Sequence, residues 1–307
     1  MLNVRKLSSE LQEIANRELN ETPERIQGDI EALRSWIAQN SNLKSRDDDQ
    51  FLISFLRGCK FSLEKAKKKI EMFYSARTLT PEFFANRDPC DKFLSEIIDL
   101  GLILPLPVDE SKQVPRMILT RLGGYNYSKY DFISVMKVTY LMADWCMNNS
   151  DVTIISGHIN VVDLRGCGIS LMTQITPTLI KKLSSLLEPF PVRIKAIHLV
   201  NPPIGIETAF KLFMSVCHEK LRSRVFMHEN FEELAKVVDK KHLPIEYGGT
   251  NLSLPQIIDD WRQKLLENRQ WFLDDVNYRM ENISTPTATT NGSMFGAEGS
   301  FRSLDID

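Results

Sequence analysis

Residues with the type and spacing of a catalytic site do not form a complete set in this sequence. A glycine-rich loop after a strand would bind a dinucleotide, but VVDLRGCGISL has only Gly166 and Gly168, and Leu171 stands where a third glycine is needed. Neither a GxxxxGK[ST] phosphate loop nor a GxSxG nucleophile turn occurs in the 307 residues. The sequence therefore gives no support to phosphoryl transfer, dinucleotide chemistry or the usual α/β-hydrolase mechanism.

The histidines and cysteines are also scattered. Five histidines, at 158, 198, 218, 228 and 242, include no HExxH or Cys/His spacing that would hold zinc. We interpret His198 as a core residue of a strand and Asp163, at the end of another strand, as a cap. The five cysteines form no CxxC pair, which is typical of free thiols in a reducing compartment. We expect no enzyme activity, catalytic residue, metal or cofactor.

Cations gather in the segment EPFPVRIKAIHLVNPPIGIETAFKLFMSVCHEKLRSRV, residues 188–225. Arg193 opens an expected strand that Pro202 and Pro203 end. The helix that follows has one apolar stripe and a basic end, formed by Ile206, Phe210, Phe213, Cys217, Leu221, Lys220, Arg222 and Arg224. Two interpretations are open: a helix that simply covers a sheet, with cations at its carboxyl end, or a movable helix beside a lipid cavity and a cationic patch.

Composition excludes several classes of protein. A net charge of −2 offers no overall field for nucleic acid, so we expect no nucleic-acid partner. The amino terminus has no apolar signal-peptide core, and no run of about 18 apolar residues would span a membrane. We expect a cytoplasmic monomer.

The order of expected elements defines an α/β fold. Residues 1–92 predict a helical amino-terminal lobe, with a lysine run at 65–69 on a solvated helix face, and residues 93–252 alternate strands and helices. The strands lie in PRMILTRLG, HINVVDLRG, RIKAIHLV and VFMH, which predicts a mostly parallel sheet. Residues 253–282 predict a closing helical segment, and the Ser/Thr/Gly-rich residues 283–307 predict a flexible tail.

Several of these segments together resemble the CRAL-TRIO lipid-binding family, which includes carriers of tocopherol and retinaldehyde. The segments are DDDQFLISFLRGCKFSLEKAKKKIEMFY, VVDLRG, QITP, FPVRIKAIHLVNPP, FKLFMSVCHEKLRSRVFMH and LPIEYGG, in that order over about residues 25–275, and the EGSFRSLDID end is similar to insect members. The resemblance implies a sheet that floors a lipid cavity closed by a gate helix at about residues 204–222. It further implies a bound hydrophobic lipid in place of a cofactor.

The resemblance also implies the roles of individual residues. Cavity positions are Met136, Thr139, Ala143, Val161, Phe190, Val192, Ile194 and Ile197, and gate positions are Ile206, Phe210, Phe213, Met214 and Cys217. A phosphoinositide headgroup site is expected at Arg193, Lys220 and Arg224, with Arg57 and Lys60 beside it. Cys59 stands where the family has a further cation, so this part of the headgroup site departs from the pattern.

The function that the resemblance implies is that of a carrier for a small lipid such as a retinoid or tocopherol. It would be transiently peripheral to phosphoinositide-containing membranes. Two alternatives remain: a phosphoinositide-binding adaptor that carries no lipid, and a lipid-ester hydrolase that uses Asp163 or His198.

Overall fold

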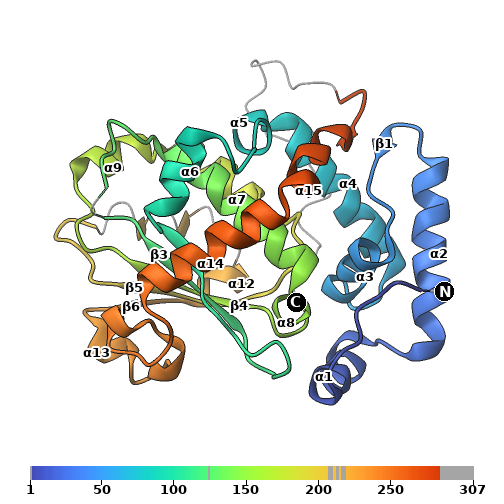
Figure 1. Ribbon diagram of the computed structural model, residues 1–307, viewed down its shortest axis with the longest axis horizontal. Coiled ribbons are helices and arrows are strands. Elements are labelled where there is room, and N and C mark those ends of the chain that lie inside the picture. Colours follow the sequence, from blue (N-terminus) through green and yellow to red (C-terminus); the bar gives the residue numbers. More distant parts are fainter. Residues whose placement is uncertain (1, 124, 207–209, 212–213, 216–218, 284–307) are drawn as a thin grey trace.

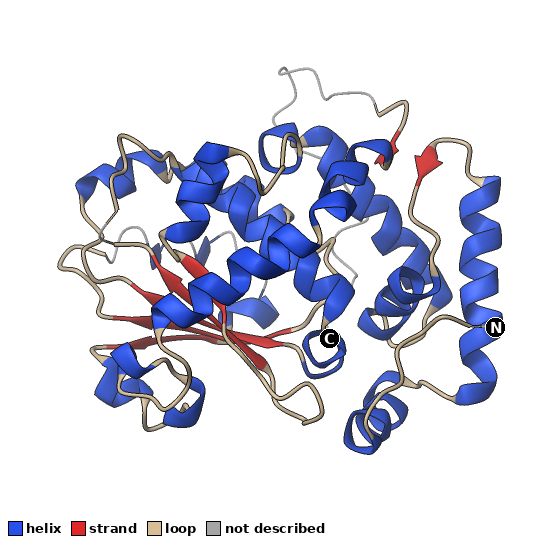
Figure 2. Ribbon diagram, in the orientation of Figure 1, coloured by secondary structure: helices blue, strands red, loops and turns tan. Residues whose placement is uncertain are grey.

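The computed structural model describes residues 2–123, 125–206, 210–211, 214–215 and 219–283. Within them a helical amino-terminal part adjoins an α/β part built on one sheet (Figure 1, Figure 2). The α/β class with a helical amino-terminal region, predicted from the order of elements, is confirmed.

The helical part begins at helices whose first turns are capped by short polar side chains. Ser8 accepts a hydrogen bond from Leu11 N, and Asp48 accepts one from Phe51 N. The elements of this part are α1 (Ser9–Leu19), α2 (Pro23–Gln39), β1 (Leu43–Lys44), α3 (Asp49–Gly58), α4 (Leu63–Leu79), α5 (Pro81–Phe84) and α6 (Lys92–Asp99). Its aromatic core continues into the α/β part, because Phe73 of α4 packs edge-on against Phe190, with ring centroids 5.5 Å apart.

The main sheet has five strands in the order β2-β3-β4-β5-β6. The strands are β2 (Ile103–Pro105), β3 (Arg116–Arg121), β4 (His158–Asp163), β5 (Ile194–Val200) and β6 (Val225–His228). β2 pairs antiparallel with β3, and the other neighbours are parallel. The four strands from β3 to β6 lie in the four predicted segments, whereas the short edge strand β2 was not predicted.

Helices and turns connect these strands. They are α7 (Phe132–Asn149), α8 (Asp151–Ser156), α9 (Ile169–Gln174), α10 (Pro177–Ser185), α12 (Glu219–Arg222), α13 (Phe231–Leu234), η1 (Lys240–His242) and η2 (Ile245–Tyr247). α7 is the longest, and Asp131 caps it by accepting from Ser134 N.

The carboxyl-terminal elements return to the helical part (Figure 1). They are α14 (Leu254–Glu267), α15 (Arg269–Asp274), η3 (Asp275–Asn277) and β7 (Arg279–Met280), and β7 pairs antiparallel with β1. The Arg46 guanidinium lies 4.0 Å from the ring centroid of Trp271 and 4.3 Å from that of Tyr278. This closing segment therefore fastens the two parts of the chain together.

Candidate functional site

The two faces of the main sheet differ in how fully they are covered. One face, here called the packed face, carries Leu119, Val161 and Val200, each 0% exposed within the core. α14 packs beside the edge strand β2, where Trp261 Nε1 donates a hydrogen bond to Pro105 O at 2.7 Å.

The opposite face, here called the hollow face, is less covered although its residues come from central strands. Its cross-strand rows are Ile118, Asn160 and Ile197, and Thr120, Val162 and Leu199. Ile197 is 8% exposed and the other five are partly exposed. A central strand with both faces packed would bury such residues completely, so this face borders space that the described helices do not fill.

α7 stands on the hollow-face side. Ile103 pairs with Thr120 and shares its face, and it lines a small void with Val135, Val138 and Met142 of α7. The predicted cavity residues Met136, Thr139 and Ala143 are spaced to share a neighbouring side of this helix. All three are partly exposed, in a helix whose other residues are mostly buried.

The strand register corrects one predicted cavity residue. Val161 pairs with Leu119 and His198, so it belongs to the packed face, whereas Ile197 belongs to the hollow face. Successive side chains of a strand point to opposite faces, and one cavity therefore cannot be lined by both Val161 and Ile197. His158, Asn160 and Val162 are the β4 residues on the hollow face.

The remaining predicted cavity residues lie before or at the start of β5. Phe190 stacks on Tyr140 with centroids 5.9 Å apart, and Val192 packs against the core of the helical part. Ile194 opens β5, where the pairing with β4 is irregular. These residues line the junction of the two parts.

The predicted gate residues are described in part. Ile206, Phe210 and Met214 are partly exposed, and Phe210 N donates to Ile206 O at 2.9 Å, as in a helix. Phe213 and Cys217 lie outside the described residues.

The amino end of β5 brings four basic side chains together, Lys60, Arg193, Lys195 and Arg224. Lys220 lies in α12, four residues before Arg224, and these five residues are here called the basic edge. Burial lowers the pKa of Lys195, and so do the neighbouring charges of Arg193, Arg224 and Lys60, while Glu18 opposes them. Arg193 is buried, donates to Ile155 O and lies 3.7 Å from Glu18, and Arg224 donates to Ile194 O at 2.7 Å. Lys195 was not predicted as part of the headgroup site. The sequence VRIK contained a signal, because Arg193 and Lys195 alternate with apolar residues at the start of the strand.

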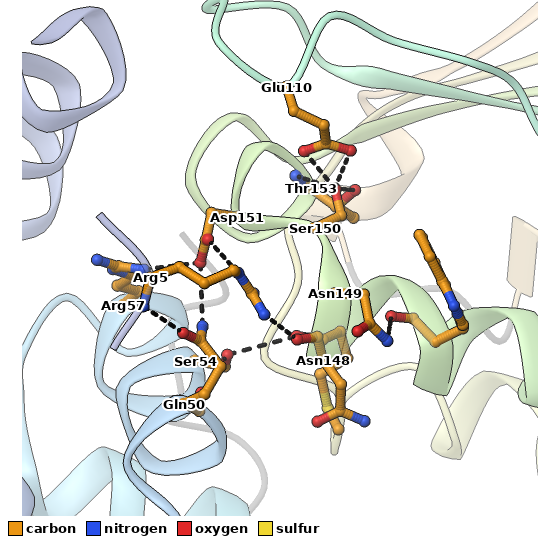
Figure 3. A network of polar contacts seen from close by, with 12 residues as sticks. Arg5, Gln50, Ser54, Arg57, Glu110, Asn148, Asn149, Ser150, Asp151 and Thr153 are labelled. Atoms are coloured by element: carbon orange, nitrogen blue, oxygen red, sulfur yellow. Dashed lines mark hydrogen bonds and ion pairs between the residues drawn. The ribbon is translucent and has the colours of Figure 1, made fainter. Parts of the chain in front are cut away.

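Arg57 does not belong to the basic edge, contrary to the prediction. Its side chain is 2% exposed, and its Nε lies 2.8 Å from Glu21. Its Nη1 lies 2.8 Å from Asp151, and Figure 3 shows Arg57 beside this carboxylate. Arg5 and Gln50 bind the same Asp151 carboxylate. The charge of Arg57 is neutralised inside the protein and is not available to a headgroup.

Cys59 and the lysine run lie beside the basic edge. Burial raises the pKa of the Cys59 thiol to about 11, against the opposing charges of Lys69 and Lys65. Lys69 donates to Glu188 O at 2.7 Å, and burial lowers its pKa. Lys69 is therefore a structural contact between α4 and the loop before β5, not part of a solvated face as predicted.

The groups considered for catalysis bind other parts of the protein. Asp163 accepts hydrogen bonds from Arg165, Asn201 and Tyr247, at 2.8 to 3.0 Å. His198 Nδ1 lies 2.8 Å from His228 Nε2, and burial lowers the pKa of His198 to about 4. Among the described residues, no group of three or more His, Cys, Asp or Glu side chains is placed to hold a metal ion.

Comparison with known proteins identifies the fold family. A "CRAL/TRIO domain" model matches residues 108–249, and a "Pinta-like, UBA domain" model matches residues 22–94. The chain therefore contains a CRAL/TRIO domain at residues 108–249. The hollow face and the basic edge both lie within its CRAL-TRIO domain, apart from Lys60.

Relatives of this CRAL-TRIO protein cover most of its length. A human alpha-tocopherol transfer protein-like protein is 29% identical over 272 residues, which are 88% of this chain and 78% of the relative. Human clavesin-2 is 25% identical over 284 residues, 91% and 85% of the two chains. The solved structure of Sfh5 aligns with a TM-score of 0.47 and 13% identity over 84% of this chain and 97% of its own. None of the helices in the described part of the CRAL-TRIO protein is long and apolar enough to span a bilayer.

Proposed function

We propose that this CRAL-TRIO protein is a cytoplasmic, monomeric carrier of a small hydrophobic lipid, such as a retinoid or tocopherol. The observation that carries the proposal is the hollow face, where apolar residues of central strands stay partly exposed. Burying several hundred Å² of lipid surface at about 25 cal/mol per Å² strongly favours binding. The tocopherol-transfer name of one group of relatives supports the same class of ligand.

Release of the lipid requires an event at the target membrane, because free exit into water would forfeit that favourable burial. We assign this event to contact between the basic edge and phosphoinositide headgroups. The cations come from Lys195, which is exposed, and from Lys60, Lys220 and Arg224, which are partly exposed. The attraction of each cation to an anionic membrane surface is worth about 1 kcal/mol. The apolar side chains of the segment after β5, including Phe210 and Met214, would then enter the interface as the lipid leaves.

The carrier function is tested by native mass spectrometry of the purified protein, followed by organic extraction of whatever accompanies it. A hydrophobic molecule in a one-to-one complex is the expected result, and its identity names the ligand. If the protein binds no copurified or added lipid but still binds phosphoinositide vesicles, it is an adaptor and not a lipid carrier.

The role of the basic edge is tested by charge reversal. Lys195→Glu with Lys220→Glu should slow lipid transfer to phosphoinositide vesicles by about tenfold or more, since each change removes a cation worth about 1 kcal/mol. Lys44→Glu, at an exposed position of β1 in the helical part, is the control. Equal rates for the double variant and the control would remove the basic edge from the mechanism, and zwitterionic vesicles should abolish the difference.

A further inference from the structure

The hollow face contains two polar side chains on its central strand. His158 and Asn160 are two residues apart in β4, so they point to the same side. His158 pairs with Arg116, and Asn160 pairs with Ile118. The row of Asn160 is otherwise apolar, with Ile118 on one side and Ile197 on the other.

Neither of these side chains has a hydrogen-bond partner in the described part of the protein. His158 is 8% exposed, and its Nδ1 is fully buried without a partner. Asn160 is partly exposed, and none of the described residues forms a hydrogen bond with its amide group. Buried polar groups are nearly always paired, and an unpaired one costs free energy. The buried Nδ1 of His158 is therefore the group that requires a partner outside the described residues, and Asn160 is the polar side chain nearest to it on the same face of β4.

The chemistry of the two side chains specifies an uncharged oxygen. Burial lowers the pKa of His158 to about 4, so the imidazole is neutral near pH 7 and offers one donor and one acceptor nitrogen. The Asn160 amide also offers both. Two residues along a strand rise by about 7 Å, so an oxygen between the side chains is within reach of both.

The position of His158 and Asn160 in the sheet also determines the direction in which a bound lipid would lie. His158 opens β4, and its backbone N donates to Arg193 O at 2.9 Å, next to the basic edge. Val162 and Leu199 extend the apolar surface toward the other end of the strands.

We propose that His158 and Asn160 bind the polar group of the carried lipid, an alcohol or carbonyl oxygen, and so select an oxygenated lipid over a hydrocarbon. The inference rests on the proposed carrier function and adds the class and direction of the ligand. The oxygen end lies toward the basic edge, and the hydrocarbon lies along Val162 and Leu199.

The test compares two fluorescent probes that differ by one group: retinol and the hydrocarbon analogue that lacks its hydroxyl. Their dissociation constants are measured for the full-length wild type, Asn160→Leu, His158→Phe and Val162→Ala, each checked for folding by circular dichroism. The wild type should prefer retinol by about tenfold, the size expected for one hydrogen bond to a buried group. Asn160→Leu and His158→Phe should each bring the two affinities within about twofold of one another. Val162→Ala should weaken both probes equally and keep the preference.

The outcomes separate the inference from the function on which it rests. If the wild type binds both probes equally well, the protein can still be a lipid carrier, but His158 and Asn160 do not bind the lipid oxygen. A trapped water would then satisfy the two side chains. A preference that survives both substitutions overturns the inference too. Binding of neither probe by the wild type counts against the carrier and the polar pair together.

Discussion

Arg57 is held by two carboxylates that reach it from distant parts of the chain. Glu21 precedes it by 36 residues and Asp151 follows it by 94, and both are bound at 2.8 Å. The local motif LRGCK contains the cation but neither partner. Whether such an arginine binds a ligand or pairs with carboxylates inside the protein can be decided only when its tertiary partners are known.

Arg57→Ala should therefore destabilise the fold. It leaves Glu21, which is 0% exposed, without its partner, and removing one member of a buried ion pair costs about 3–5 kcal/mol. Urea unfolding measures the change, with Arg17→Ala, which removes only exposed ion pairs, as a control worth less than about 1 kcal/mol. An Arg57→Ala protein of unchanged stability that no longer binds phosphoinositide vesicles would return Arg57 to the headgroup site.

His158 should make stability depend on pH. Burial lowers its folded-state pKa from 6.5 to about 4, so between these values the unfolded chain binds a proton that the folded protein excludes. The free energy of unfolding should fall as the pH drops through this window, by up to about 1.4 kcal/mol per pH unit from this residue. Well above pH 6.5, where the unfolded chain is also deprotonated at this residue, the contribution to the slope vanishes.

The measurement is a series of urea unfolding curves at several pH values for the ligand-free wild type and His158→Phe. The free energy of unfolding of the wild type minus that of His158→Phe should fall steadily in the acid range, because only the wild type contains the titrating group. Parallel pH profiles would show that His158 is protonated as easily in the folded protein as in the unfolded chain.

At the scale of elements, the strands could be predicted because each has a clear local signal. HINVVD and IKAIHLV are apolar runs that end at Asp163 and before Pro202. The assignment of Val161 to the cavity failed, because only the register with β3 and β5 shows which side chains of the three strands point together. β2 was missed because three residues ending in a proline give no periodicity.

The connection after β5 is fixed by Asn201, which has a left-handed backbone conformation. Its φ is 56°, and its Nδ2 donates to Asp163 Oδ1 at 2.8 Å. Asn201→Gly should lose the hydrogen bond alone, about 1 kcal/mol. Asn201→Ala should cost about 1–2 kcal/mol more, because alanine disfavours this conformation.

Thermal unfolding of the two Asn201 variants gives the order of stability. Equal melting temperatures would mean that the backbone at Asn201 adjusts without strain. A glycine variant as stable as the wild type would mean that the bond to Asp163 contributes nothing.

At the scale of the whole molecule, a second buried ionic cluster joins the helical part, α7 and the closing segment. Arg77 of α4 and Arg87 share the carboxylates of Asp144 in α7 and Asp275 in η3. All four side chains are buried. Burial opposes ionisation of Asp275, but the charges of Arg77 and Arg87 hold its pKa below the ordinary value. Removing any member leaves an opposite charge in the interior.

The two parts should consequently unfold together. Wild-type unfolding in urea should give one transition, coincident by tryptophan fluorescence and by far-ultraviolet circular dichroism. Trp36 reports on the helical part, and Trp145 and Trp261 report on the α/β part. Arg87→Ala should lower the free energy of unfolding by about 3–5 kcal/mol, because Asp144 and Asp275 then share only Arg77.

The same substitution shows whether the cluster links the two parts or only stabilises one of them. If it links them, the fluorescence and dichroism transitions of Arg87→Ala should separate, since the helical part loses a tie to α7 and η3. Arg269→Ala breaks only the exposed pair with Asp88 and should keep a single transition within about 1 kcal/mol of the wild type. A destabilised Arg87→Ala protein whose two transitions still coincide would mean that the shared aromatic core of Phe73, Tyr140 and Phe190 is sufficient to couple the parts.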